Sequence, residues 1–128
     1  MAEFSNYLEN KVLDHVLRNT SYNSPTTVYV GLYTTDPTDA GSGTEVSGGS
    51  YARQILSVTT ATGGIVTSSA DVTFPQATAS WGSVGYIGIL DALSSGNLLM
   101  HTALTTAKTI DSGDILKISS GNLTVTLD

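Results

Sequence analysis

The sequence predicts a mainly β protein, an antiparallel β-sandwich or jelly roll that follows one N-terminal α-helix. Helical periodicity occurs once, over residues 4–18. Residues 26–128 instead hold about eight short runs of apolar and β-branched residues, separated by turns rich in Gly, Ser, Asn and Asp. Because the composition does not change along the chain, we expect one domain that spans residues 1–128.

The predicted helix, about residues 4–18, carries one apolar stripe. Its members recur at spacings of three and four residues: Phe4, Leu8, Val12, Leu13 or Val16, and Leu17. Asn6, with Glu9 three residues later, predicts an N-terminal cap. A helix of about 14 residues is only marginally stable alone in water, so the stripe must pack on something. It either closes one end of the chain's own core or contacts a neighbouring subunit.

The segment from Val28 to Val58 organises the rest of the chain. Two runs with strand-like alternation, residues 28–33 and 51–58, flank the loop of residues 34–50. The loop contains Pro37, the glycines at 41, 43, 48 and 49, and the carboxylates of Asp36, Asp39 and Glu45. Loops of this length are uncommon in compact domains and are usually functional or disordered. We therefore expect a projecting acidic loop, whose deletion from Asp36 to Gly49 leaves a folded domain.

Later segments add further strands. The pair Gly63-Gly64 predicts a hairpin turn. Residues 81–90 are apolar on both faces, which indicates a strand near the centre of the sheet, and residues 98–104 are its expected partner. Glycine inside a strand leaves bare backbone that an aromatic ring can cover, so Gly31 and Gly88 are expected to lie under rings.

Composition excludes several classes of function. The net charge is −6, with 11 acidic against 5 basic residues. This balance does not fit nucleic-acid binding, which requires clustered cations. The chain has no cysteine, no apolar run long enough to span a membrane and no signal-peptide pattern at its start. We expect neither a nucleic-acid partner nor a membrane partner.

No catalytic pattern appears. His15 and His101 are far apart in the sequence and are interpreted as ordinary residues, and no G-x-S-x-G elbow occurs. The carboxylates of Asp36, Asp39 and Glu45 could ligate calcium, but their spacing does not match an EF-hand, so a solvated acidic loop is favoured. We therefore predict a protein that is not an enzyme, with no catalytic residue, cofactor or metal.

Four segments carry a resemblance to a known family: FSNYLENKVLDHVLRN, PTTVYVGLYTTDPTDAGSGTEVSGGSYARQ, VTFPQATASWGSVGYIGILDA and GNLLMHTALTTAKTIDSGDILKISSGNLTVTLD. Together they resemble small tailed-phage virion proteins, often labelled phage tail fiber proteins. The resemblance covers nearly the whole chain. It implies a non-enzymatic structural protein, assembled in the host cytoplasm and located in the virion.

The leading interpretation of this resemblance is a capsid decoration (cement) protein. Such a protein stabilises the head through multivalent contacts. The resemblance implies a homo-oligomer, with a trimer expected, and the major capsid protein or a tail protein as partner. The candidate contact residues are Phe4, Leu8 and Val12 on the helix, and Asp36, Pro37, Asp39 and Glu45 in the loop.

Two alternatives remain open. The first is a structural component of the tail fibre, tail or baseplate with the same fold. The second is a carbohydrate-binding β-sandwich module, in which Trp81 and the tyrosines stack on sugars. Most of these aromatics alternate with apolar residues, which favours a place in the core or at its rim.

Overall fold

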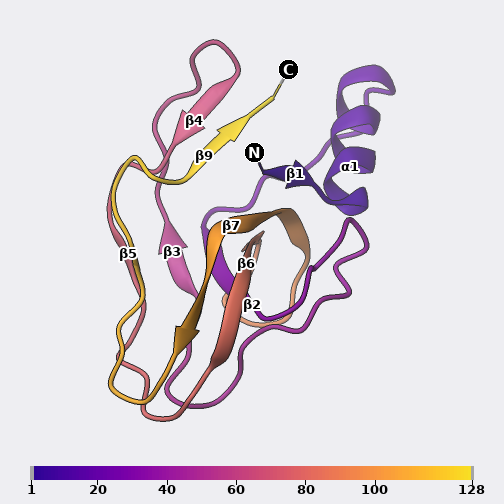
Figure 1. Ribbon diagram of the computed structural model, residues 1–128. Coiled ribbons are helices and arrows are strands. Elements are labelled where there is room, and N and C mark those ends of the chain that lie inside the picture. Colours follow the sequence, from indigo (N-terminus) through magenta and orange to yellow (C-terminus); the bar gives the residue numbers. More distant parts are fainter. Residues whose placement is uncertain (1, 128) are drawn as a thin grey trace.

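The computed structural model describes residues 2–127 (Figure 1). A single helix lies among short strands over this range. In chain order the elements are β1 (Glu3–Phe4), α1 (Asn6–Leu17), β2 (Val28–Tyr33), β3 (Gln54–Leu56), β4 (Ile65–Thr67), β5 (Val72–Thr73), β6 (Gly82–Leu90), β7 (Leu98–Ile110), β8 (Lys117–Ile118) and β9 (Thr124–Thr126). The prediction of a mainly β protein with one N-terminal helix is confirmed.

The strands form one five-stranded sheet and two short ladders. The sheet has the order β1-β7-β6-β2-β3, whereas β4 pairs with β9 and β5 with β8. Every pair is antiparallel. β6 occupies the centre of the sheet and pairs with β7, so both predictions about residues 81–90 are confirmed.

One hydrophobic core joins the sheet to the ladders. Val30 and Leu32 of β2 are fully buried and belong to the same cluster as Val72 of β5 and Val125 of β9. Because β2 side chains alternate between faces, one face of the sheet packs against the ladders and the other remains available for a second layer. The ladders flank the sheet on the side away from α1 (Figure 1).

Aromatic side chains fill one end of this core. The Tyr51 ring stacks on Phe74, with centroids 6.2 Å apart, and meets Trp81 edge-on at 5.5 Å. Trp81 is only 4% exposed, and its indole N–H donates to the carbonyl of Gly49 at 2.9 Å. The core interpretation of Trp81 is therefore confirmed, and this ring has no free face on which a sugar could stack.

The N-cap residue of α1 lies one position earlier than the sequence predicts. Ser5, not Asn6, is the N-cap: its hydroxyl accepts from the backbone N–H of Leu8 at 3.2 Å. The same hydroxyl donates to the carbonyl of Leu98, so the cap also fixes the helix to β7. A buried serine outcompetes the asparagine because it satisfies both the helix end and a strand carbonyl.

Only the first half of the helical stripe packs on the body of the protein. Leu8 is 6% exposed, whereas Leu13, Val16 and Leu17 are 54%, 68% and 74% exposed. α1 contacts β1 and β7 near its start, and its far end extends away from the sheet (Figure 1). The stripe therefore closes one edge of the core and leaves an apolar surface beyond it.

The loop of residues 34–50 folds back on the sheet, so the prediction of a projecting loop is wrong. The N–H of Thr34 donates to the Thr44 carbonyl and that of Val46 to the Leu32 carbonyl, both at 2.9 Å. The Pro37 side chain is fully buried. Gly43 permits this packing, because a Cβ there would lie 2.6 Å from the Pro37 Cα. Gly49 is similarly crowded, since a Cβ there would lie 2.9 Å from Trp81 Nε1, so these two glycines allow close packing of the loop.

Gly31 and Gly88 are direct cross-strand partners in β2 and β6. The Tyr33 ring covers Gly88, since a Cβ there would lie 2.8 Å from Tyr33 Cε1, as predicted. Gly31 is covered differently: a Cβ there would lie 2.9 Å from a Glu45 carboxylate oxygen and 3.2 Å from the Tyr51 hydroxyl oxygen. The prediction holds for Gly88, whereas the polar end of a tyrosine and a carboxylate cover Gly31.

Candidate functional site

A polar cleft of about 540 Å³ lies over the face of the sheet that bears Gly31 and Gly88. Its floor includes Tyr33, Leu90 and Leu98, which form a small cluster separate from the main core. Its walls come from the start of α1, the 34–50 loop and the 95–98 turn. The residues that line it are Ser5, Asn6, Tyr7, Tyr33, Asp39, Ala40, Gly41, Gly43, Glu45, Arg53, Leu90, Ser95, Gly96, Asn97 and Leu98.

Glu45 and Arg53 form a two-point ion pair in the cleft wall. Arg53 Nε and Nη2 each donate to a Glu45 carboxylate oxygen at 2.8 Å. Arg53 Nη1 also donates to the carbonyls of Ala92 and Ser95, at 2.7 and 2.9 Å. The hydrogen bond to Glu45 raises the pKa of Arg53, against the lowering effect of burial. The guanidinium therefore connects the 34–50 loop to the turn before β7.

Tyr51 completes this group. Its hydroxyl donates to Glu45 Oε2 at 2.5 Å and accepts from the N–H of Leu32 at 3.0 Å. Burial, and then the hydrogen bond to Glu45, raise the pKa of the Tyr51 phenol. Burial likewise raises the pKa of Tyr33. These groups neutralise and satisfy one another, so they brace the wall of the cleft.

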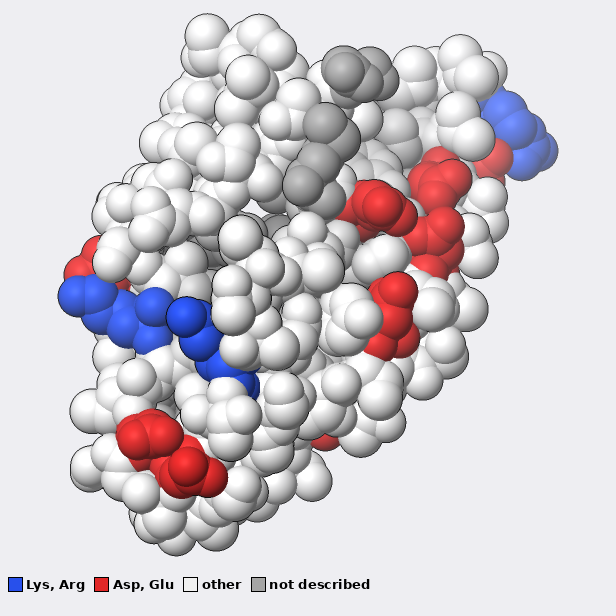
Figure 2. Space-filling view, viewed as in Figure 1, with Lys and Arg blue, Asp and Glu red and all other residues white. Residues whose placement is uncertain are grey.

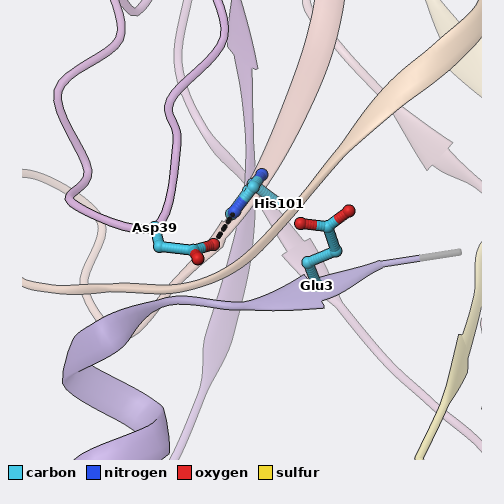
Figure 3. A group of neighbouring side chains, drawn as sticks. All are labelled: Glu3, Asp39 and His101. Atoms are coloured by element: carbon cyan, nitrogen blue, oxygen red, sulfur yellow. Dashed lines mark hydrogen bonds and ion pairs between the residues drawn. The ribbon is translucent and has the colours of Figure 1, made fainter.

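A second cluster centres on His101 of β7, which is 7% exposed. Its Nε2 lies 2.8 Å from Asp39 Oδ1, and its Nδ1 lies 3.8 Å from Asp36 Oδ1. Glu3 is its cross-strand partner in β1. The side chains of Glu3, Asp39 and His101 point toward one another from three separate segments (Figure 3).

The sequence did not indicate that His101 meets carboxylates. Asp39 is 62 residues away along the chain, and the pairing depends on the path of the folded loop. The one available signal was that Asp36 and Asp39 lie close together in the sequence. In the structure their carboxylates lie beside the two ring nitrogens of His101. His15, by contrast, is exposed on α1 and accepts from the backbone N–H of Tyr22 at 3.3 Å.

The structure divides the sequence-predicted contact residues into three groups. Leu8 and Pro37 are buried in the chain's own packing, and Phe4 and Val12 are half-buried against the core. The side chains of Asp36 and Asp39 are 53% and 47% exposed. Glu45 is held by Arg53 and Tyr51. The loop carboxylates thus go to two different places, rather than forming the one calcium-type set considered for Asp36, Asp39 and Glu45.

Charge is unevenly distributed over the surface. Acidic side chains gather on the part of the molecule near β1 and α1, with basic side-chain atoms beside them at the outer end of α1; a second acidic group and other basic side chains lie at the opposite margin (Figure 2). With a net charge of −6, this face presents carboxylates to any partner.

Over the described residues, no helix combines the length and apolarity that a bilayer crossing requires.

Comparison with known proteins identifies one family. A search of curated proteins returns no match. The family model described as Podophage GP4 fiber I protein gp80 matches residues 3–126. This match favours the fibre alternative over the head-decoration interpretation. Because it covers nearly the whole sequence, the chain belongs to this family of phage fibre proteins and is a component of the virion.

Proposed function

We propose that the chain is a non-enzymatic structural subunit of a phage tail fibre, which acts through contacts with other tail proteins and with copies of itself. The observation that carries this proposal is the match of residues 3–126 to a podophage fibre protein. The hydrogen bonding of the polar groups in the cleft wall to one another agrees with this proposal. Glu45, Arg53 and Tyr51 are bound to one another and offer no reactive group to a substrate.

The far end of α1 is the surface best suited to a subunit contact. Val16 and Leu17 follow Leu13 by three and four residues, so the three side chains share one side of the helix. Large apolar side chains that are more than half exposed and lie together mark interaction surfaces more often than isolated ones do. Val12, four residues before Val16, is half-buried against the core and continues this surface toward the body of the protein. We call the set Leu13, Val16 and Leu17 the helix surface.

The proposed partner for the helix surface is a second copy of this chain, in a homo-oligomer for which a trimer is the expected form. A cyclic assembly would bring the same helix of each copy to a shared axis. Asp36, whose side chain is about half exposed, would lie among the polar contacts of this assembly. Many such subunit contacts give a stable fibre without any single strong binding site.

Two substitutions test the helix surface. We expect Val16→Lys with Leu17→Lys to dissociate the oligomer, measured as molar mass by light scattering after size exclusion. Lysine is chosen because the C-terminal end of a helix tolerates a positive charge. The matched control is Ile115→Lys, because Ile115 is 58% exposed but lies outside α1. An unchanged mass in the double variant, or equal dissociation in the control, would remove the helix surface from the proposal.

Position in the particle tests the fibre role itself. An epitope tag on this protein, detected by gold-labelled antibody in electron micrographs of intact phage, should mark the tail fibres. Label distributed over the head surface would instead support capsid decoration and refute the fibre proposal. Incorporation of the protein only into particles that lack tails would refute the fibre proposal as well.

A further inference from the structure

The His101 cluster brings together three side chains that carry metal-binding atoms. Glu3 comes from β1, Asp39 from the 34–50 loop and His101 from β7. One ligand atom from each lies within 4.8 Å of the others. Two carboxylates are exposed while the imidazole is buried, so the nitrogen is fixed and the oxygens can adjust around it (Figure 3).

We propose that Glu3, Asp39 and His101 bind a divalent first-row transition-metal ion, with Zn²⁺ as the ion that this ligand set favours. Imidazole nitrogen suits Zn²⁺ and its neighbours in the series, whereas Ca²⁺ and Mg²⁺ take oxygen ligands. Three protein ligands leave a fourth position for water. The site is formed by one strand pair and one loop.

The distances are compatible with this ion after small movements. Bonds of about 2.0–2.2 Å in a tetrahedral site place ligand atoms roughly 3.4 Å apart. The 2.8 Å separation of His101 Nε2 and Asp39 Oδ1 would therefore lengthen as the metal replaces the shared proton. Glu3 would move inward. Its exposed side chain on a two-residue strand has the rotamer freedom to do so.

The other imidazole nitrogen supplies an independent argument. His101 Nδ1 faces the Asp36 carboxylate at 3.8 Å. Metal-binding histidines commonly have a carboxylate next to the nitrogen that does not bind the metal, which fixes the tautomer and raises the basicity of the ligating nitrogen. At 3.8 Å the Asp36 carboxylate lies next to Nδ1 without a hydrogen bond to it, and Nε2 is the nitrogen that faces Asp39.

Binding at this site would order the base of α1. Glu3 lies three residues before the helix, and the N–H of Asn6 donates to the carbonyl of Asp39 at 2.9 Å. An ion that joins Glu3 and Asp39 to β7 would therefore hold both chain segments that set the direction of the helix. Metal binding would also neutralise two exposed carboxylates, those of Glu3 and Asp39.

Isothermal titration of the EDTA-treated, dialysed full-length protein with ZnCl₂ tests the proposal, with thermal unfolding as a second readout. We expect one ion per chain, micromolar or tighter affinity, and a higher midpoint with Zn²⁺ than without. Glu3→Gln and Asp39→Asn should each weaken binding at least tenfold, as His101→Gln should. Because Glu3 is exposed, Glu3→Gln remains informative even if the histidine variant fails to fold.

Matched controls are His15→Gln and Asp111→Asn, an exposed histidine on α1 and an exposed carboxylate just after β7. Both should bind Zn²⁺ as the wild-type protein does. Zn²⁺ binding that survives in Glu3→Gln and Asp39→Asn, or that disappears in His15→Gln, would overturn the assignment. So would a millimolar affinity, or Ca²⁺ binding of equal strength that His101→Gln leaves unchanged.

Discussion

Replacing Arg53 with methionine provides the most direct test of how the 34–50 loop is held. The Arg53 and Glu45 side chains are only 9% and 23% exposed, and the substitution leaves the carboxylate with the Tyr51 hydroxyl as its remaining side-chain partner. Breaking a fully buried pair costs roughly 3–5 kcal/mol because one charge stays buried without a partner. The partial exposure of Glu45 reduces this penalty, and we expect a loss of about 2–4 kcal/mol in the free energy of unfolding.

The assay is urea unfolding followed by circular dichroism, with calorimetry as a check. For a domain of this size the loss corresponds to a fall of roughly 10 °C in Tm. Arg18→Met is the control, because Arg18 and Asp14 form a pair at 3.2 Å whose side chains are 72% and 40% exposed. That pair should contribute less than about 0.5 kcal/mol. If Arg53→Met changed stability no more than the control, the loop would not depend on the ion pair.

Two further predictions concern the same face of the sheet. Gly88→Ala would place a Cβ 2.8 Å from Tyr33 Cε1 and should destabilise the protein by about 1–3 kcal/mol in urea unfolding, whereas Gly85→Ala, whose Cβ has its nearest neighbour at 3.9 Å, should cost about 1 kcal/mol or less. Because a Cβ at Gly88 would also lie 2.7 Å from Leu98 Cδ1, equal effects would show that neither close contact is important. The raised pKa of Tyr51 should make stability full below the ordinary tyrosine pKa of about 10 and decline above it, because the unfolded chain then loses its phenolic proton first. Unfolding between pH 9 and 12 should show a shallower decline for Tyr51→Phe; identical slopes would contradict the assignment.

Sequence pattern predicted the elements that depend on local periodicity. The alternation in residues 28–33 and 81–90 reflects which side chains face the core, and the pair Gly63-Gly64 sits in the expected turn, with Thr62 and Ile65 bridged. The helix was also predictable, because its stripe has the helical period. The distinction between the packed and unpacked halves of that stripe was not, since it depends on where the sheet ends.

The contacts of the 34–50 loop could not be predicted from local sequence patterns. Glycine and carboxylates predict solvent exposure on average, but here the glycines permit tight backbone packing and the carboxylates meet distant cations or donors. Arg53 is close in sequence to Glu45, yet the same guanidinium also binds the carbonyls of Ala92 and Ser95. His101 gave no local signal at all. Pairings of this kind arise from chain topology, which periodicity does not encode.

The packing of the loop changes how its role must be tested. Deletion of Asp36–Gly49 was expected to leave a folded domain, but it would remove the buried Pro37 and Val46 side chains and the Glu45 partner of Arg53. It would also remove Asp39, which binds the N–H of Asn6 at the start of α1. Loss of assembly in such a variant would therefore report a damaged core and a misplaced helix rather than a lost contact. Substitution of Asp36, which is about half exposed, separates the two effects better. It removes the bond from the Thr38 N–H and the contact with His101, but it leaves the buried Pro37 and Val46 side chains and the Glu45–Arg53 pair in place.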